Sequence, residues 1–117
     1  MNESFDREKA KKHLSEQVEL EKESNEKERQ ALLEKTIFVL NEKLSGKGLE
    51  IYLVGSITKP YAFTQLSDID IVLKGFRGDR FELWTQLEEL IGRNIELILY
   101  ESCSFKEDLD SLGLKVI

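Results

Sequence analysis

The chain has 117 residues, of which 40% are hydrophobic and 34% are charged, and its net charge is −6. This length suits one small domain with a core and leaves no room for a second domain of ordinary size. The acidic balance argues against a long nucleic acid as partner, because a polyanion is bound by a basic surface. No apolar run approaches the roughly 18–20 residues that span a bilayer, so no membrane segment is expected.

The cysteine and histidine content limits the kinds of disulfide and metal site that the chain can form. Cys103 is the only cysteine, which excludes an internal disulfide and a multi-cysteine zinc site, and His13 is the only histidine, which excludes a multi-histidine metal centre. The charged first residues do not resemble a secretory signal. We therefore expect a cytoplasmic protein, with His13 solvated and Cys103 packed against neighbours.

The first quarter of the chain is a charged helical arm, residues 1–30. It contains no glycine or proline, opposite charges recur at helical spacing, and no apolar residue occurs between Glu21 and Gln30. Such a segment is either a solvated helix or an arm that packs on a partner through Leu14 and Val18, in a homo- or hetero-oligomer. We place the domain itself at residues 31–117.

The domain begins with a helix and a strand. Between residues 31 and 44 apolar side chains recur at spacings of three and four, which is typical of a helix that packs on a core, and Gly46 ends it. Residues 49–54 are rich in β-forming side chains and predict a strand. Residues 57–62 predict a short helix, since Pro60 lies near its first turn.

The second half of the chain alternates strands and helices. Residues 67–74 predict a strand, and Asp79 resembles the N-cap of a helix that Gly92 ends. Residues 94–100 predict a third strand and residues 105–112 a last helix, before a short terminal strand. This order indicates an α/β (α+β) domain, with a small mixed sheet of three to four strands packed with helices.

Two aspartates interrupt the apolar strand at residues 67–74. Side chains two positions apart on a strand point to the same face, so Asp68 and Asp70 lie together. Neighbouring carboxylates repel each other unless a cation joins them, and oxygen ligands suit Mg²⁺. Glu96 interrupts the third strand in the same way, and it would lie opposite the aspartates if the two strands are neighbours. Three carboxylates at one point make a two-metal site plausible.

A glycine and a serine, Gly55 and Ser56, follow the first strand. Glycine lets the backbone approach a phosphate, and the amides of a helical turn bind an anion. Gly55-Ser56, eleven residues and then Asp68-Ile69-Asp70 resemble the Gly-Ser…Asp-x-Asp pattern of the DNA polymerase β-like nucleotidyltransferase superfamily, and most of all its minimal (MNT-type) branch. The resemblance runs from about residue 32 to residue 117.

The resemblance implies an activity and a partner. Asp68, Asp70 and Glu96 would be the catalytic, metal-binding acids that hold one or two Mg²⁺ ions. Gly55 and Ser56 would bind the phosphates of ATP, assisted by Lys59. MNT-type proteins are often antitoxins that add AMP from ATP to a tyrosine of a HEPN-domain toxin, a small helical ribonuclease.

The sequence departs from the family pattern at two positions, and two further functions stay open. After Gly-Ser the family usually carries an arginine, where this chain has Ile-Thr-Lys-Pro-Tyr-Ala-Phe, and Glu96 replaces the usual third aspartate. The chain can therefore also be an antitoxin of weak or no activity that neutralises its partner by binding. A third interpretation is an antibiotic nucleotidyltransferase, although those usually carry an extra helical domain.

Overall fold

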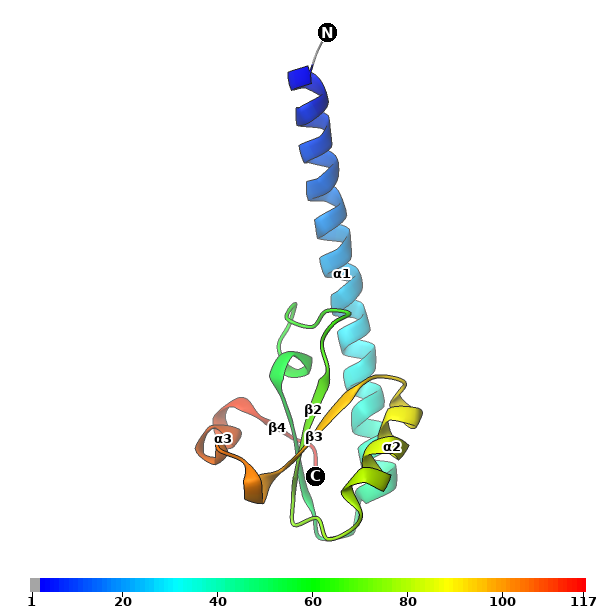
Figure 1. Ribbon diagram of the computed structural model, residues 1–117, viewed down its shortest axis with the longest axis vertical. Helices are drawn as coiled ribbons and strands as arrows, with labels where there is room; N and C mark the ends of the chain where they lie inside the picture. The colour runs from blue at the N-terminus through cyan, green and yellow to red at the C-terminus, as the bar shows by residue number, and fades with distance from the viewer. Residues whose placement is uncertain (1–2) are drawn as a thin grey trace.

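The computed structural model describes the backbone of residues 3–117 and the side chains of residues 7–109 and 112–117. A long N-terminal helix leads into a small sheet, and the C-terminal segment returns along that sheet (Figure 1). In chain order the elements are α1 (Glu3–Leu44), β1 (Glu50–Val54), a 3₁₀ turn (Gly55–Thr58), β2 (Ile69–Lys74), α2 (Arg80–Ile91), β3 (Ile95–Leu99), short 3₁₀ turns at Tyr100–Ser102 and Lys106–Asp108, α3 (Leu109–Leu112) and β4 (Leu114–Lys115).

The four strands form one mixed sheet in the order β3-β2-β1-β4. β1 pairs antiparallel with both β2 and β4, whereas β2 and β3 are parallel. The expected small mixed sheet packed with helices is therefore confirmed. The register places Val54 opposite Asp70 and Asp70 opposite Glu96, so three neighbouring strands meet at these residues.

Helix α2 begins and ends at the capping residues predicted from the sequence, Asp79 and Gly92. The Asp79 side chain accepts hydrogen bonds from the backbone N–H groups of Phe81 and Glu82, as an N-cap should. Gly92 ends the helix with φ 77°, a left-handed conformation that glycine adopts without steric cost.

Two of the expected short helices differ in the structure. The helix predicted at residues 57–62 is a 3₁₀ turn that ends at Thr58, and Lys59 is extended with φ −115° and ψ 122°. The reason is Pro60, because the residue before a proline is driven out of the helical region. The helix predicted at residues 105–112 is divided into the 3₁₀ turn Lys106–Asp108 and the four-residue α3.

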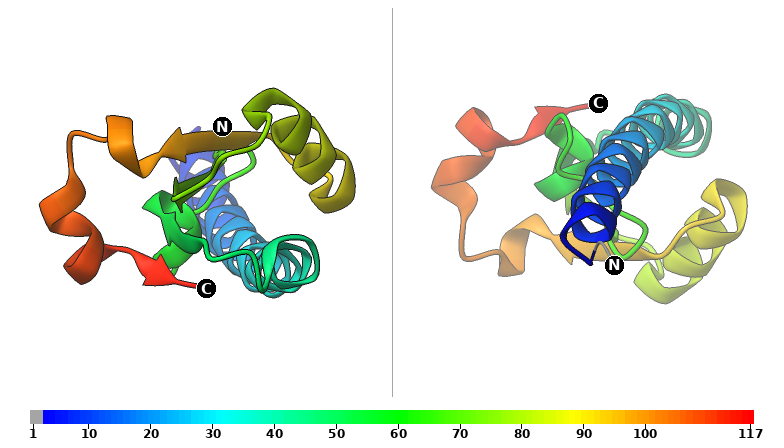
Figure 2. Two further views of the ribbon diagram at one scale, coloured as in Figure 1. Left: turned by 90° about the horizontal axis from the view of Figure 1, so that it is seen from below. Right: turned by 90° about the horizontal axis from the view of Figure 1, so that it is seen from above.

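The two faces of the sheet are covered differently. Helices α1 and α2 cover one face, and the C-terminal segment that contains α3 crosses the other (Figure 2). The helix-covered face holds the main core, which includes Leu40, Ile71 and Leu87, all fully buried. The opposite face holds a small cluster of Tyr52, Val72 and Leu109. Asp70 lies on this second face, since side chains two apart on β2 share a face.

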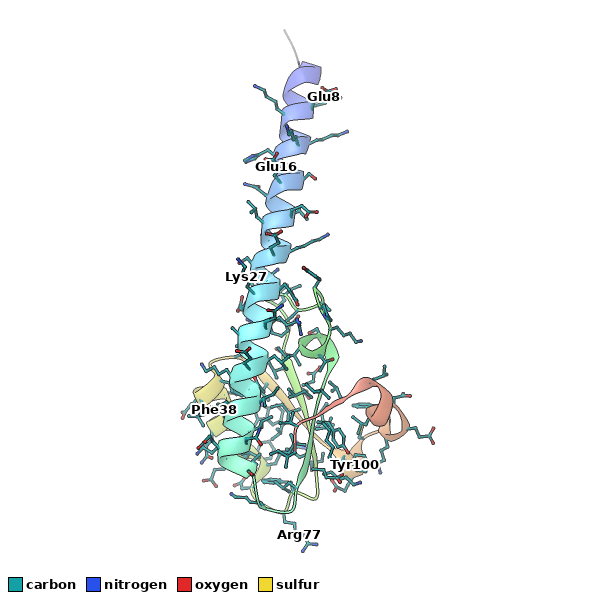
Figure 3. The ribbon with its side chains drawn as sticks, turned by 180° about the vertical axis from the view of Figure 1, so that it is seen from behind. Glu8, Glu16, Lys27, Phe38, Arg77 and Tyr100 are labelled. Atoms are coloured by element: carbon teal, nitrogen blue, oxygen red, sulfur yellow. The ribbon has the colours of Figure 1, made fainter. Side chains whose placement is uncertain are left out.

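Helix α1 is one continuous helix that extends far beyond the sheet. The molecule measures 69 × 30 × 20 Å, and the N-terminal half of α1 stands clear of the other elements, as the labels Glu8 and Glu16 show in Figure 3. Contact with the domain begins with the buried side chains of Glu26 and Arg29. The division at residue 30 stays a prediction. No helix within the described residues combines the length and apolar character that crossing a membrane requires.

Candidate functional site

The candidate site lies where β1 ends and where β2 and β3 begin. Gly55 follows β1 with φ 78°, and a Cβ placed on it would lie 2.5 Å from Oδ2 of Asp70. Only glycine satisfies both conditions, because a side chain would strain the backbone and collide with the carboxylate. The turn that begins at Gly55 therefore lies directly against the acidic residue on the neighbouring strand.

Of the three acids predicted from the sequence, Asp68 and Glu96 each lie close enough to Asp70 for their charges to act on it. Asp70 and Glu96 are partners in the parallel β2–β3 register and point to the same face of the sheet. Asp68 is exposed in the loop just before β2. Burial, together with the negative charges of Asp68 and Glu96, raises the pKa of Asp70 above its ordinary value. The site thus concentrates negative charge that a cation would relieve.

A cavity of about 390 Å³ opens over this part of the sheet. Its polar wall contains four residues predicted from the sequence, which are Gly55, Lys59, Asp70 and Glu96. Its apolar wall comes from the sheet and from the C-terminal segment, and consists of Val54, Ile98, Phe105, Leu109 and Leu112, with Asp108 beside them. Such an apolar enclosure with a few convergent polar groups is typical of a small-molecule site.

Two of the predicted residues do not line this cavity. Ser56 is half-buried within the 3₁₀ turn, and Asp68 lies outside, although its charge acts on Asp70. The sequence interpretation also missed the apolar wall. Its signal was present, because Phe105, Leu109 and Leu112 recur at spacings of four and three, as on one helix face.

The donor chemistry of the acids fits a hard divalent cation. Mg²⁺ prefers oxygen ligands and is usually bound through one or two carboxylates together with phosphate oxygens of the substrate. Asp70 and Glu96 supply such oxygens on one face. Within the described part of the chain, however, no three Asp, Glu, His or Cys side chains already form a metal-binding group. A metal would therefore need ligands from the substrate or a shift of these side chains.

Comparison with known proteins identifies the fold. No family model matches the chain, and no curated protein matches it. Two solved structures are similar, and both are crystal structures of the toxin–antitoxin pair MntA–HepT. One is a mutant complex in which two aspartates two positions apart are replaced by glutamate; it is 24% identical, with a TM-score of 0.53, and the match covers 73% of this chain and 72% of that one. The other is also 24% identical, with a TM-score of 0.50 and coverage of 75% and 71%. The chain therefore shares the fold found in these two structures.

Proposed function

We propose that this protein is a nucleotidyltransferase antitoxin that moves AMP from Mg·ATP to a hydroxyl, a tyrosine in our expectation, of a partner toxin of the HEPN type. The observation that carries the proposal is the register of β1, β2 and β3. It brings the Gly55 turn, Asp70 and Glu96 together at the mouth of one cavity. A phosphate-binding turn beside paired carboxylates is what metal-dependent transfer to a phosphate ester requires.

The two similar structures support this proposal in a second way. In one of them the replaced aspartates have the spacing that Asp68 and Asp70 have here. Both structures are of a toxin–antitoxin pair. A protein partner therefore suits this chain better than an antibiotic.

Each residue of the site has a proposed task in the transfer. Asp68, Asp70 and Glu96 would hold Mg²⁺, which neutralises charge on the triphosphate and lowers the pKa of the attacking hydroxyl. The backbone at Gly55 and Ser56 would bind the β- and γ-phosphates. The exposed ammonium of Lys59, at the edge of the cavity, would replace the arginine usual after Gly-Ser.

The reaction itself is a substitution at the α-phosphorus. The hydroxyl oxygen forms a new P–O bond, the bond to the β-phosphate breaks, and pyrophosphate leaves with the electron pair while the hydroxyl proton passes to solvent. The apolar wall of the cavity would shield one side of the reacting phosphate from water, which would favour transfer to the acceptor over hydrolysis.

A mass measurement on the purified pair tests the proposal. The partner to test is a small helical ribonuclease of the HEPN type, sought in the reading frame adjacent to that of this chain. The pair is incubated with Mg·ATP, and the partner should gain the mass of one AMP. The Asp68→Asn/Asp70→Asn double variant should leave the partner unmodified. Labelling of the partner by the double variant would refute the assignment of these acids.

A second candidate function is neutralisation by binding alone. The projecting half of α1 favours this function, since the apolar side chains of Leu14, Val18 and Leu20 are exposed there. Neutralisation by binding is also favoured by the arrangement of the acids, because within the described residues no three of them already form a metal-binding group. If the partner is inhibited in the complex but gains no mass with Mg·ATP, this second function is correct and the first is wrong.

A further inference from the structure

Two oppositely charged side chains on α1, Glu26 and Arg29, are almost fully buried. They are 6% and 7% exposed, in a stretch of the helix whose sequence contains no apolar residue. Nε of Arg29 donates a hydrogen bond of 2.9 Å to Oε2 of Glu26. Burial alone would raise the pKa of Glu26, but the hydrogen bonds from Arg29 and from the Tyr61 N–H, with the charge of Arg29, hold this pKa below its usual value.

Both members of the pair also bind the backbone of the segment 55–61. Nη1 of Arg29 donates a 2.9 Å hydrogen bond to the carbonyl of Ile57. The backbone N–H of Tyr61 donates to Oε2 of Glu26 at 3.1 Å, and Tyr61 is held in a left-handed conformation with φ 62°. The pair thus holds this segment by hydrogen bonds at two points, Ile57 and Tyr61, which lie on either side of Lys59.

The segment 55–61, which this pair holds, is also the segment that contacts the acidic residue Asp70. It begins at Gly55, which lies directly against Asp70, and the side chain of Thr58 closes the turn by a 2.8 Å hydrogen bond to the Gly55 carbonyl. Ile57, between the two, is fully buried and fixes the turn against the core. The path from α1 to Asp70 is therefore one of direct contacts.

We propose that Glu26 and Arg29 are positioning residues that hold the segment 55–61 in the conformation that receives the phosphates of the nucleotide. This inference rests on the proposed function. A buried pair is often no more stabilising than apolar side chains of similar size, and the further hydrogen bonds of this pair go to backbone atoms on either side of Lys59, so its effect falls on that segment. A bidentate guanidinium fork binds a carboxylate and a carbonyl at once with defined geometry.

The choice of variants separates positioning from stability. Arg29→Lys keeps the positive charge beside Glu26 but loses the fork, so that one ammonium cannot reproduce both bonds with the same geometry. Arg29→Met removes the charge and keeps much of the length. Lys27→Met, on the exposed side of the same helix, is the matched control. Each variant is made in the full chain, and thermal unfolding is recorded for all three.

The first measurement is amide hydrogen exchange without nucleotide. The amides of the segment 55–61 should exchange about tenfold faster in Arg29→Met than in wild type, because the charge-assisted hydrogen bond from Arg29 to the Ile57 carbonyl is lost. The amides of β2 should be unaffected, and Lys27→Met should match wild type. Unchanged exchange of the segment 55–61 in Arg29→Met would overturn the inference.

The second measurement is the steady-state rate of AMP transfer by the same variants. Arg29→Lys should raise the KM for ATP by about tenfold and leave kcat within about twofold, because phosphate binding is lost rather than chemistry. A KM equal to that of wild type in Arg29→Lys would contradict the positioning role. If wild type itself neither binds nor uses Mg·ATP, the proposed function fails and the role toward the nucleotide fails with it, whereas the exchange result still reports whether the pair orders the segment.

Discussion

The two faces of the sheet differ in what covers them and in what they contain. The face under α1 and α2 adjoins the main core, whose apolar side chains are fully buried, such as Ile71 of β2 and Leu40 of α1. The opposite face carries Asp70 and Glu96 and is covered only by the short segment around α3, which leaves a cavity of about 390 Å³. Most of the stability should therefore come from the first face, and the chemistry from the second.

This division explains how acidic residues are tolerated inside strands. β2 and β3 each alternate, so one set of side chains joins the main core while the other set is free to be polar. The main core is large enough to hold the sheet without help from the other face. Asp70 can consequently keep an unfavourable environment, which its raised pKa reflects.

The largest effect should come from Asp70 on the acidic face. We expect Asp70→Asn to lower the rate of AMP transfer by about 10²–10³-fold, the loss typical when one preorganised group that stabilises charge is removed. Single-turnover rates with the proposed partner provide the measurement, and Glu89→Gln, exposed on α2, is the control. A rate within threefold of wild type would contradict the assignment of the chemistry to the face that carries Asp70.

A core substitution should affect stability far more than one on the open face. Leu40→Ala should lower the free energy of unfolding by about 2–5 kcal/mol, because it leaves a cavity in the packed core. Leu112→Ala, at the rim of the site, should cost less than about 0.5 kcal/mol, since that side chain is 61% exposed. Urea denaturation measures both, and equal costs would show that the two faces contribute alike.

Gly55 and Gly46 form a matched pair that isolates the contact with Asp70. Both have φ near 79°, at +78° and +79°, but a Cβ on Gly46 meets nothing within 4 Å, whereas one on Gly55 meets the Asp70 carboxylate. Alanine at either position should cost about 1–3 kcal/mol for the backbone strain. Only Gly55→Ala should also weaken ATP binding, measured by calorimetry. Equal ATP affinity in the two variants would contradict the placement of the turn.

The smallest effect should be a pH-dependent gain in stability for Asp70→Asn. Because the folded pKa of Asp70 is raised, the native state holds the proton more tightly than the unfolded state, and wild type loses stability as the pH rises from about 3.8 through the folded pKa. Asparagine lacks this titration. Above that window the variant should be more stable by less than about 1 kcal/mol, since Asp70 is only partly buried and solvent screens the charges. Urea midpoints at pH 7 and pH 3 test it; a gain that persists at pH 3 would have another cause.

Much of the open face could be predicted from the sequence. The pairing of Asp70 with Glu96 followed from two acids that interrupt apolar strands, once these strands are neighbours. Asp79 and Gly92 marked the ends of α2 because capping is a local interaction between residues close in the chain. Capping signals and the alternation of side chains along strands were thus sufficient to predict the main elements of the fold and the pairing of Asp70 with Glu96.

What the sequence did not reveal depends on contacts between distant segments. Glu26 and Arg29 lie in a run of charges that is typical of a solvated helix, and their partners are backbone atoms of Ile57 and Tyr61. Every residue has a carbonyl and nearly every residue an N–H, so no pattern marks these partners in advance. The proline that shortened the expected helix at residues 57–62 is the opposite case, because its effect on Lys59 is local.

The projecting half of α1 has a hydrodynamic consequence. The radius of gyration is 18.8 Å, whereas a compact chain of this length would have about 13 Å. The free protein should therefore sediment slowly and elute early from a sizing column, as if it were heavier than it is. If a partner binds alongside the projecting half of α1, the mass of the particle increases while its longest dimension barely changes. The frictional ratio of the assembly should then be lower than that of the chain alone.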